Sequence, residues 1–201
     1  MYEKIGLVIL GAVLGKVIDV YLQRRKIFHL QAAILEELED TKDRLSLICR
    51  AYERAVQIFA LGGFSADIPL KLSNPIFKKY YSDIAIKIGA SQRQSLSLIN
   101  SYVDAINNGI DKVDKAHPGT SENLSEEMLN RWGELLKGQY RNAATAYWHV
   151  NYHLSNKELP HLGEEDSDVH KSYIAQLDSS NEHLKKLIEG ARDNLSRDGF
   201  Q

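Results

Sequence analysis

The feature that most constrains this chain is an apolar segment near its start. Residues 5–22 read IGLVILGAVLGKVIDVYL, and Lys16 and Asp19 are the only charged residues among these 18. A helix of this length extends roughly 27 Å, slightly less than the ~30 Å hydrocarbon core of a bilayer. Because a short span is tolerated when the bilayer thins or flanking side chains snorkel, the segment predicts an N-terminal single-pass transmembrane helix.

The charges around this segment predict its orientation. Arg24, Arg25 and Lys26 follow it directly, whereas a single lysine precedes it. By the positive-inside rule, the N-terminus then lies outside the cell membrane and the rest of the chain lies in the cytoplasm. The three basic residues are expected at the membrane surface. The predicted organisation is a membrane anchor with a basic flank over residues 1–26 and a cytoplasmic helical bundle over residues 27–201.

Three other kinds of segment have a comparable apolar run: a secretory signal peptide, a buried core helix and a helix lying on the membrane surface. A secretory signal peptide needs small residues at a cleavage site after the apolar run, and the sequence from Val17 to Val20 offers none. A buried core helix, or a helix lying flat on the membrane surface, would accommodate the two charges within the segment. These two interpretations remain open beside the spanning helix.

One side of the segment is small and polar. At 100° per residue, Gly11, Gly15, Lys16 and Asp19 share a face, and the opposite side is almost entirely aliphatic. The Gly-x-x-x-Gly spacing lets two helix backbones approach closely, and the two charges can pair locally or with another helix. This predicts a partner face for a second transmembrane helix. The alternative places the inner end of a short span in the headgroup layer, where both charges contact water.

The rest of the chain has the pattern of an all-α protein. Apolar residues recur at steps of three and four, and no convincing alternating strand pattern is present. Gly62-Gly63 is expected to end the first helix, and Asn74-Pro75 to begin the next with a cap and a first-turn proline. The expected helices run through residue 61 and over about 75–88, 92–115, 125–154 and 168–195. About four long helices predict an up-down helical bundle.

The loop after the first long helix is a candidate docking site. Residues 62–74 read GGFSADIPLKLSN, which places Phe64, Ile68 and Leu70 among small and polar residues. Such apolar side chains either pack back onto the bundle or dock a partner or the membrane surface.

Two histidines form the only motif with metal-ligand spacing. His149 and His153 are four residues apart and share a helical face. The metalloprotease pattern needs glutamate directly after the first histidine, and Val150 occupies that position. Structural or surface histidines are therefore favoured over a metal site. No phosphate-binding glycine loop or nucleophile elbow is present, so the sequence predicts no enzyme and no cofactor.

The overall charge limits the class of partner. The chain has 25 basic and 27 acidic residues, a net charge of −2, which argues against nucleic acid as a partner. The leading hypothesis is a non-enzymatic single-pass membrane protein whose cytoplasmic domain binds another protein, in recruitment or sensing, or forms a homo-oligomer. One alternative is a membrane-perturbing effector, such as a toxin or a phage-defence protein. A lower alternative is a metal-dependent enzyme that uses His149 and His153.

Overall fold

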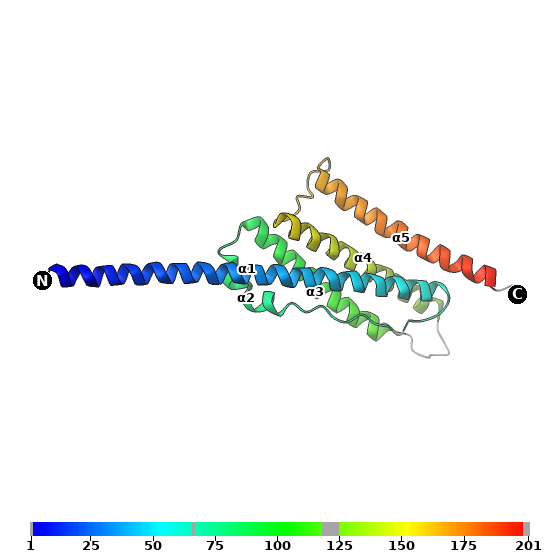
Figure 1. The fold of residues 1–201 in the computed structure, drawn as a ribbon. Coiled ribbons are helices and arrows are strands. Elements are labelled where there is room, and N and C mark those ends of the chain that lie inside the picture. The colour runs from blue at the N-terminus through cyan, green and yellow to red at the C-terminus, as the bar shows by residue number, and fades with distance from the viewer. Residues whose placement is uncertain (1, 66, 118–124, 199–201) are drawn as a thin grey trace. The chain divides into compact units, whose positions relative to one another are not determined.

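Five helices account for the secondary structure of the described chain. The computed structural model describes residues 2–65, 67–117 and 125–198, without the side chains of residues 2–9, 12, 192 and 194–198. No strand occurs in these residues, which confirms the predicted all-α class. The helices are α1 (Tyr2–Ala60), α2 (Pro75–Ala85), α3 (Ala90–Ala116), α4 (Glu126–Asn156) and α5 (Asp168–Asp198) (Figure 1).

The predicted transmembrane helix is not confirmed. Within the part of the chain that the structure describes, no helix combines the length and the apolar character that a membrane crossing requires. The side chains of residues 5–9 and 12, which belong to the predicted span, lie outside that description.

The chain divides into two compact units. Unit 1 consists of Met1–Glu37 and Asn74–Ile88, and so holds the first part of α1 together with α2. Unit 2 consists of Leu38–Ser73 and Gly89–Gln201, and holds the second part of α1 with α3, α4 and α5.

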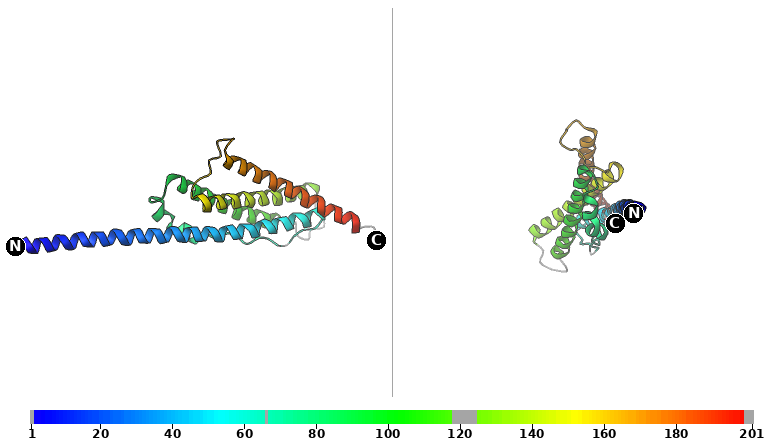
Figure 2. Two further views of the ribbon diagram at one scale, coloured as in Figure 1. Left: turned by 45° about the horizontal axis from the view of Figure 1, so that its top comes forward. Right: turned by 90° about the vertical axis from the view of Figure 1, so that its left-hand side faces the viewer.

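Helices α3, α4 and α5 of unit 2 pack in alternating directions. Ser95 near the start of α3 contacts His153 near the end of α4, and Arg141 of α4 donates to Asn181 of α5 over 2.8 Å. Trp148 of α4 also contacts Tyr173, close to the start of α5. Figure 1 shows α5 beside α4, and the left view of Figure 2 shows that the two helices cross at an angle. The predicted helical bundle is thus present.

The second part of α1 departs from a simple up-down order. Phe59, at the end of α1, fills the space beside Gly133 of α4, where a Cβ atom would clash with its ring. His117, directly after α3, contacts the neighbouring Trp132. The ends of α1 and α3 therefore both lie near the start of α4, so these two helices run in the same direction. Residues 61–65 and 67–73, named the strap here, lead back from this end of the unit along α3.

The apolar periodicity locates the core of unit 2 correctly. Apolar residues at steps of three and four are buried along α3, and the buried residues of α1 in this unit have the same spacing and begin at Leu38. The buried α3 side chains are Leu96, Ile99, Val103, Ile106, Ile110 and Val113. Helix α1 ends at Ala60, just before the expected glycine pair, and Gly62 has a φ of 80°, which favours glycine.

Helix α2 is capped by a residue far from it in the sequence. Pro75 occupies its first turn as expected, but the side chain of Asn74 does not cap the helix. The Glu37 carboxylate does so instead: its two oxygens accept from the backbone N–H groups of Ile76 and Phe77, both at 2.7 Å. The expected Asn74 side-chain cap is wrong because a carboxylate on α1 takes its place. Lys26 and Asp83 then pair at 3.6 Å, so α2 runs antiparallel to α1 within unit 1.

We predict that Glu37→Gln loosens α2. The substitution removes the negative charge that stabilises the helix N-terminus and weakens two hydrogen bonds, at a cost of about 1–2 kcal/mol. Amide hydrogen exchange should then quicken across α2, with little change in α4. Glu36→Gln is the matched control, because Glu36 is exposed. Equal exchange in the two variants would contradict the capping role.

Candidate membrane-binding and partner-binding sites

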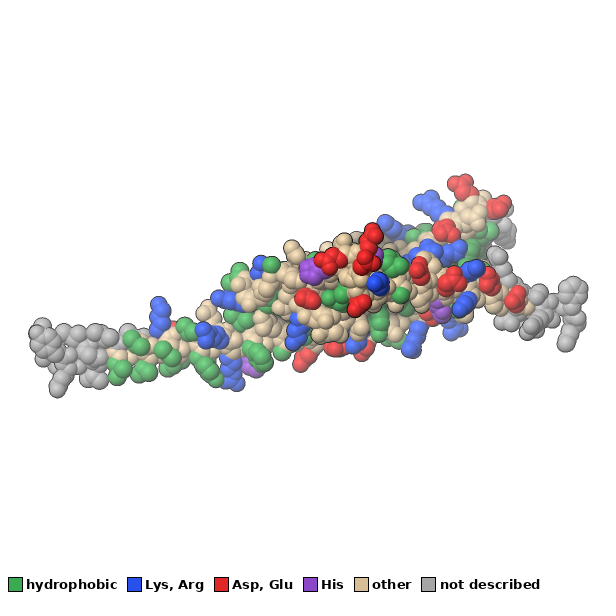
Figure 3. Space-filling model, turned by 90° about the horizontal axis from the view of Figure 1, so that it is seen from above, with side chains coloured by type: hydrophobic (Ala, Val, Ile, Leu, Met, Phe, Trp, Pro, Cys, Tyr) green, Lys and Arg blue, Asp and Glu red, His purple; other side chains and the backbone are tan. Residues whose placement is uncertain are grey.

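The most unusual surface of unit 1 is on α1. The structure describes most side chains of the apolar segment from residue 10 to residue 22, and the name is used for these residues from here on. Eight large hydrophobic side chains in this range are between 43% and 63% exposed. They are Leu10, Val13, Leu14, Val17, Ile18, Val20, Tyr21 and Leu22. Figure 3 shows green hydrophobic side chains along the described start of α1 on the face in view. A contiguous apolar surface of this kind marks an interaction site.

The predicted partner face is also accessible. Gly11, Gly15, Lys16 and Asp19 are all exposed. A Cβ atom built on either glycine would have no neighbour within 4 Å among the described residues. Another helix backbone therefore has free access to this face, and its role in binding a partner stays a prediction.

The predicted basic flank lies directly beyond the apolar segment. Arg24, Arg25 and Lys26 are exposed, as expected for residues at a membrane surface. Two of them have partners on unit 1: Arg25 contacts His29 at 3.4 Å, and Lys26 pairs with Asp83 of α2. Helix α2 brings a further cation to this region, which no local sequence pattern indicates. Lys87, just after α2, lines the same surface groove as Arg24.

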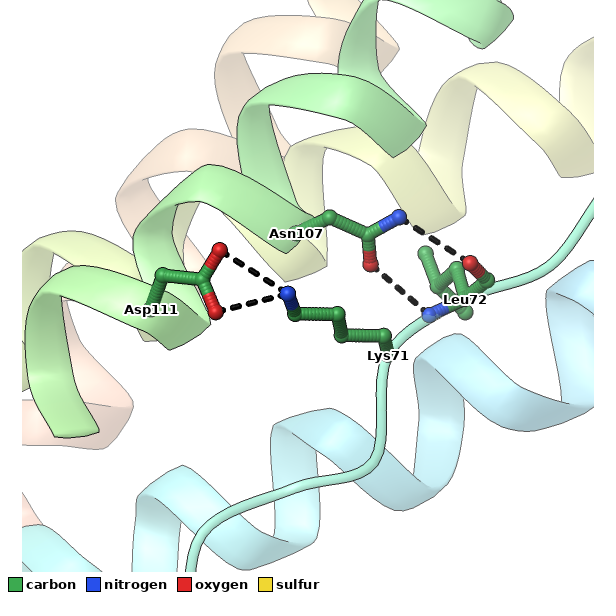
Figure 4. A network of polar contacts seen from close by, with 4 residues as sticks. All are labelled: Lys71, Leu72, Asn107 and Asp111. Carbon is green, nitrogen blue, oxygen red and sulfur yellow. Dashed lines mark hydrogen bonds and ion pairs between the residues drawn. The ribbon is translucent and has the colours of Figure 1, made fainter.

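The strap is fixed along α3 by side chains of that helix (Figure 4). Asn107 binds both backbone groups of Leu72: its Oδ1 accepts from the N–H at 2.8 Å, and its Nδ2 donates to the carbonyl at 3.0 Å. The ammonium of Lys71 lies 2.7 Å from the Asp111 carboxylate. At the other end of the strap, the ring Nε2 of His117 donates to the Ser65 carbonyl over 3.1 Å.

The three apolar residues predicted to dock a partner have different environments. Phe64 is half-buried, with its ring 6.5 Å from that of Phe59 and 6.3 Å from that of His117. Ile68 is also half-buried. Leu70 is 89% exposed, beside the Lys71 ion pair. Of these three residues, Leu70 is therefore the one whose side chain is exposed to solvent, and docking stays a prediction for all three.

The two histidines with metal-ligand spacing are buried in unit 2. His153 is fully buried and its Nδ1 lies 2.8 Å from the Ser95 hydroxyl. The His149 ring stacks on Tyr102 with a centroid distance of 5.0 Å. Burial lowers the pKa of each imidazole to about 4, so both rings are neutral at physiological pH. The described residues contain no group of three His, Cys, Asp or Glu side chains arranged to hold a metal.

The one cysteine has the surroundings of a structural thiol. Burial, together with the nearby Glu53 carboxylate, raises the pKa of the Cys49 thiol to about 12. A thiol of such high pKa has almost no reactive thiolate at neutral pH.

Comparisons with known proteins found no matching family model, no similar curated protein and no similar solved structure.

We predict that Asn107→Ala releases the strap. The substitution leaves both backbone groups of Leu72 without their partner, which costs about 1–3 kcal/mol because Leu72 is buried. Limited proteolysis should cut the strap faster than in the wild type, and the melting temperature should fall. Asn108→Ala is the control, since Asn108 is exposed on the next position of α3. Equal cleavage rates would count against the role of Asn107.

We predict that unit 2 loses stability in mild acid. The pKa of His149 and His153 is about 4 in the folded protein and about 6.5 in the unfolded chain, so the unfolded chain binds protons first as the pH falls. Stability should therefore fall from about pH 6.5 to about pH 4, by on the order of 3 kcal/mol per histidine over the full range.

Urea unfolding at several pH values measures this loss. His149→Phe keeps an aromatic ring beside Tyr102 and should weaken the pH dependence by about half. His161→Phe is the control at an exposed position. An unchanged pH dependence in His149→Phe would show that the acid sensitivity has another origin.

Proposed function

We propose that this chain is a non-enzymatic protein attached to the cytoplasmic side of a membrane, where its helical bundle binds another protein. The observation that carries the proposal is the apolar segment, with eight exposed large hydrophobic side chains within residues 10–22. A helix with such a surface needs a bilayer or another protein to cover it.

The size of this surface supports stable attachment. Covering a half-exposed large apolar side chain gains roughly 1 kcal/mol, so eight such side chains together offer on the order of 8 kcal/mol. The basic flank of Arg24, Arg25 and Lys26 adds attraction to anionic lipids, at about 1 kcal/mol for each residue near the surface. A helix that lies in the membrane interface can reach this binding strength, and so can a helix that crosses the bilayer.

The strap supports the protein-binding part of the proposal. Leu70 is exposed beside two fixed points, the Asn107 contacts to Leu72 and the Lys71–Asp111 ion pair. A loop that is already ordered loses little conformational entropy when a partner binds. Leu70 is therefore the anchor that we expect a partner protein to contact.

The chemistry of the buried groups also supports a non-enzymatic role. His149 and His153 are neutral and enclosed in the core, and the Cys49 thiol has a raised pKa. Their surroundings suit packing between helices more than proton transfer or nucleophilic attack.

One observation favours a second candidate, a membrane-perturbing effector. Lys16 and Asp19 are exposed within the apolar segment, on the same face as the open Gly11 and Gly15. Several copies packed through this face would bring charged groups together inside the bilayer, where charged side chains favour water entry. Leakage of a dye from vesicles distinguishes this activity from simple attachment.

We predict that the full chain floats with phosphatidylcholine vesicles and that the double variant Leu14→Asp and Ile18→Asp does not. Two carboxylates in the apolar segment should weaken binding more than tenfold, because each costs about 2.5–3.5 kcal/mol in hydrocarbon. Leu47→Asp is the control, since Leu47 is an exposed leucine of α1 outside the segment.

Equal flotation of the double variant and the wild type would contradict attachment through the apolar segment. The same vesicles, loaded with dye, test the second candidate. Attachment without leakage supports the adaptor, and rapid leakage supports the effector.

A further inference from the structure

A groove in unit 1 combines apolar walls with positive charge. It has a volume of about 520 Å³ and lies where α1 leaves the apolar segment. Val20, Ile27 and Phe28 provide its apolar lining, two glutamines provide amide groups, and Arg24 and Lys87 provide the charges. No acidic side chain is among the described residues that line it. The lining therefore favours a ligand with a negative head and an apolar body.

The two charges of the groove are available to a ligand. Of the basic flank, Arg25 contacts His29 and Lys26 pairs with Asp83. The side chains of Arg24 and Lys87 have no ion-pair partner among the described residues, and both are exposed. Two unpaired cations that share one groove attract an anion more strongly than either does alone.

The position of Lys87 depends on how α2 is held. The Glu37 carboxylate fixes the first turn of α2, and the Lys26–Asp83 ion pair fixes its last part. Helix α2 then runs back along α1 and places Lys87 at the level of Arg24, from which it is separated by more than 60 residues of chain. The groove is thus built by tertiary contacts rather than by a local run of basic residues.

We propose that this groove binds the headgroup of an anionic phospholipid. The Arg24 guanidinium donates two parallel hydrogen bonds to phosphate oxygens, and the Lys87 ammonium donates a third. The glycerol and upper acyl chain then pack against Val20 and Phe28, next to the apolar segment. This inference rests on the proposed membrane attachment, which would bring the groove to the headgroup layer.

Two forms of lipid test the proposal with the full chain. The first is flotation with vesicles of phosphatidylcholine alone or mixed with a minor fraction of phosphatidylglycerol. The second is calorimetric titration with monomeric short-chain phosphatidylglycerol, with short-chain phosphatidylcholine and inorganic phosphate as comparisons. Monomeric lipid has no membrane surface potential, so the titration isolates binding in the groove from general attraction to an anionic surface.

Arg24→Gln and Lys87→Gln should each weaken binding of monomeric phosphatidylglycerol about tenfold or more. Lys79→Gln is the matched control, because it removes the same charge from an exposed position of α2 outside the groove. Flotation with phosphatidylcholine alone should stay unchanged in Lys79→Gln and Lys87→Gln. Phosphate alone should bind much more weakly than the lipid, since it lacks the apolar part.

The proposal would be overturned if Lys79→Gln and Lys87→Gln lost affinity for monomeric phosphatidylglycerol equally. It would also be overturned if the wild type bound short-chain phosphatidylcholine or inorganic phosphate as tightly as short-chain phosphatidylglycerol. Failure of the proposed attachment has a different signature, because the wild type would then not float even with phosphatidylcholine. If Lys87→Gln still floats and still prefers vesicles that contain phosphatidylglycerol, the membrane attachment is supported and binding in the groove is excluded.

Discussion

The capping of α2 by Glu37 is the contact on which the arrangement of unit 1 depends. Helix α2 has 11 residues, fewer than the ~12–15 that an isolated helix needs to be even marginally stable in water. Its first N–H groups have no partners within the helix, and the Glu37 carboxylate accepts two of them with a charge that suits the positive end of the helix dipole. The same contact sets the direction of α2. It therefore determines that Lys87, just after α2, and not a lysine of the helix itself, shares a groove with Arg24.

Unit 2 uses the same kind of contact to hold its connecting segments. A strap without regular structure has backbone groups that need partners once they are buried. Asn107 supplies them for Leu72, and the hydroxyl of Ser91 accepts from the N–H of Leu159 in the loop after α4. In each case a short polar side chain on a helix binds the backbone of a loop distant in sequence. The helices thereby order the loops, which is how Leu70 comes to be exposed on a fixed segment.

Local sequence patterns predicted the helices well and the contacts between them poorly. The stripe on α3 and the helix end at Gly62 follow from spacing and from backbone preference, so both were predictable. The roles of Glu37 and Lys87 depend on partners about 40 or more residues away, and no periodicity encodes such pairs.

The histidines are an intermediate case. Along α4 the buried positions recur at steps of three and four, and His153 continues that series after Val150; this signal indicated a core residue. The direction of α1 relative to α3 was missed because the strap has no pattern that shows where it packs.

The distribution of charge around the apolar segment argues for a lipid surface over a second copy of the same helix as its cover. Two parallel copies would bring the cations at Arg24 and Arg25 together, which like-charge repulsion opposes. Two antiparallel copies would carry these cations away from each other, but would leave the unpaired Arg24 and Lys87 without a counter-charge at either end. An anionic headgroup layer covers the apolar side chains and neutralises both cations at once. The proposed attachment and the proposed headgroup binding would then both follow from one arrangement, in which Lys87, just after α2, lies beside Arg24 at the basic end of the apolar segment.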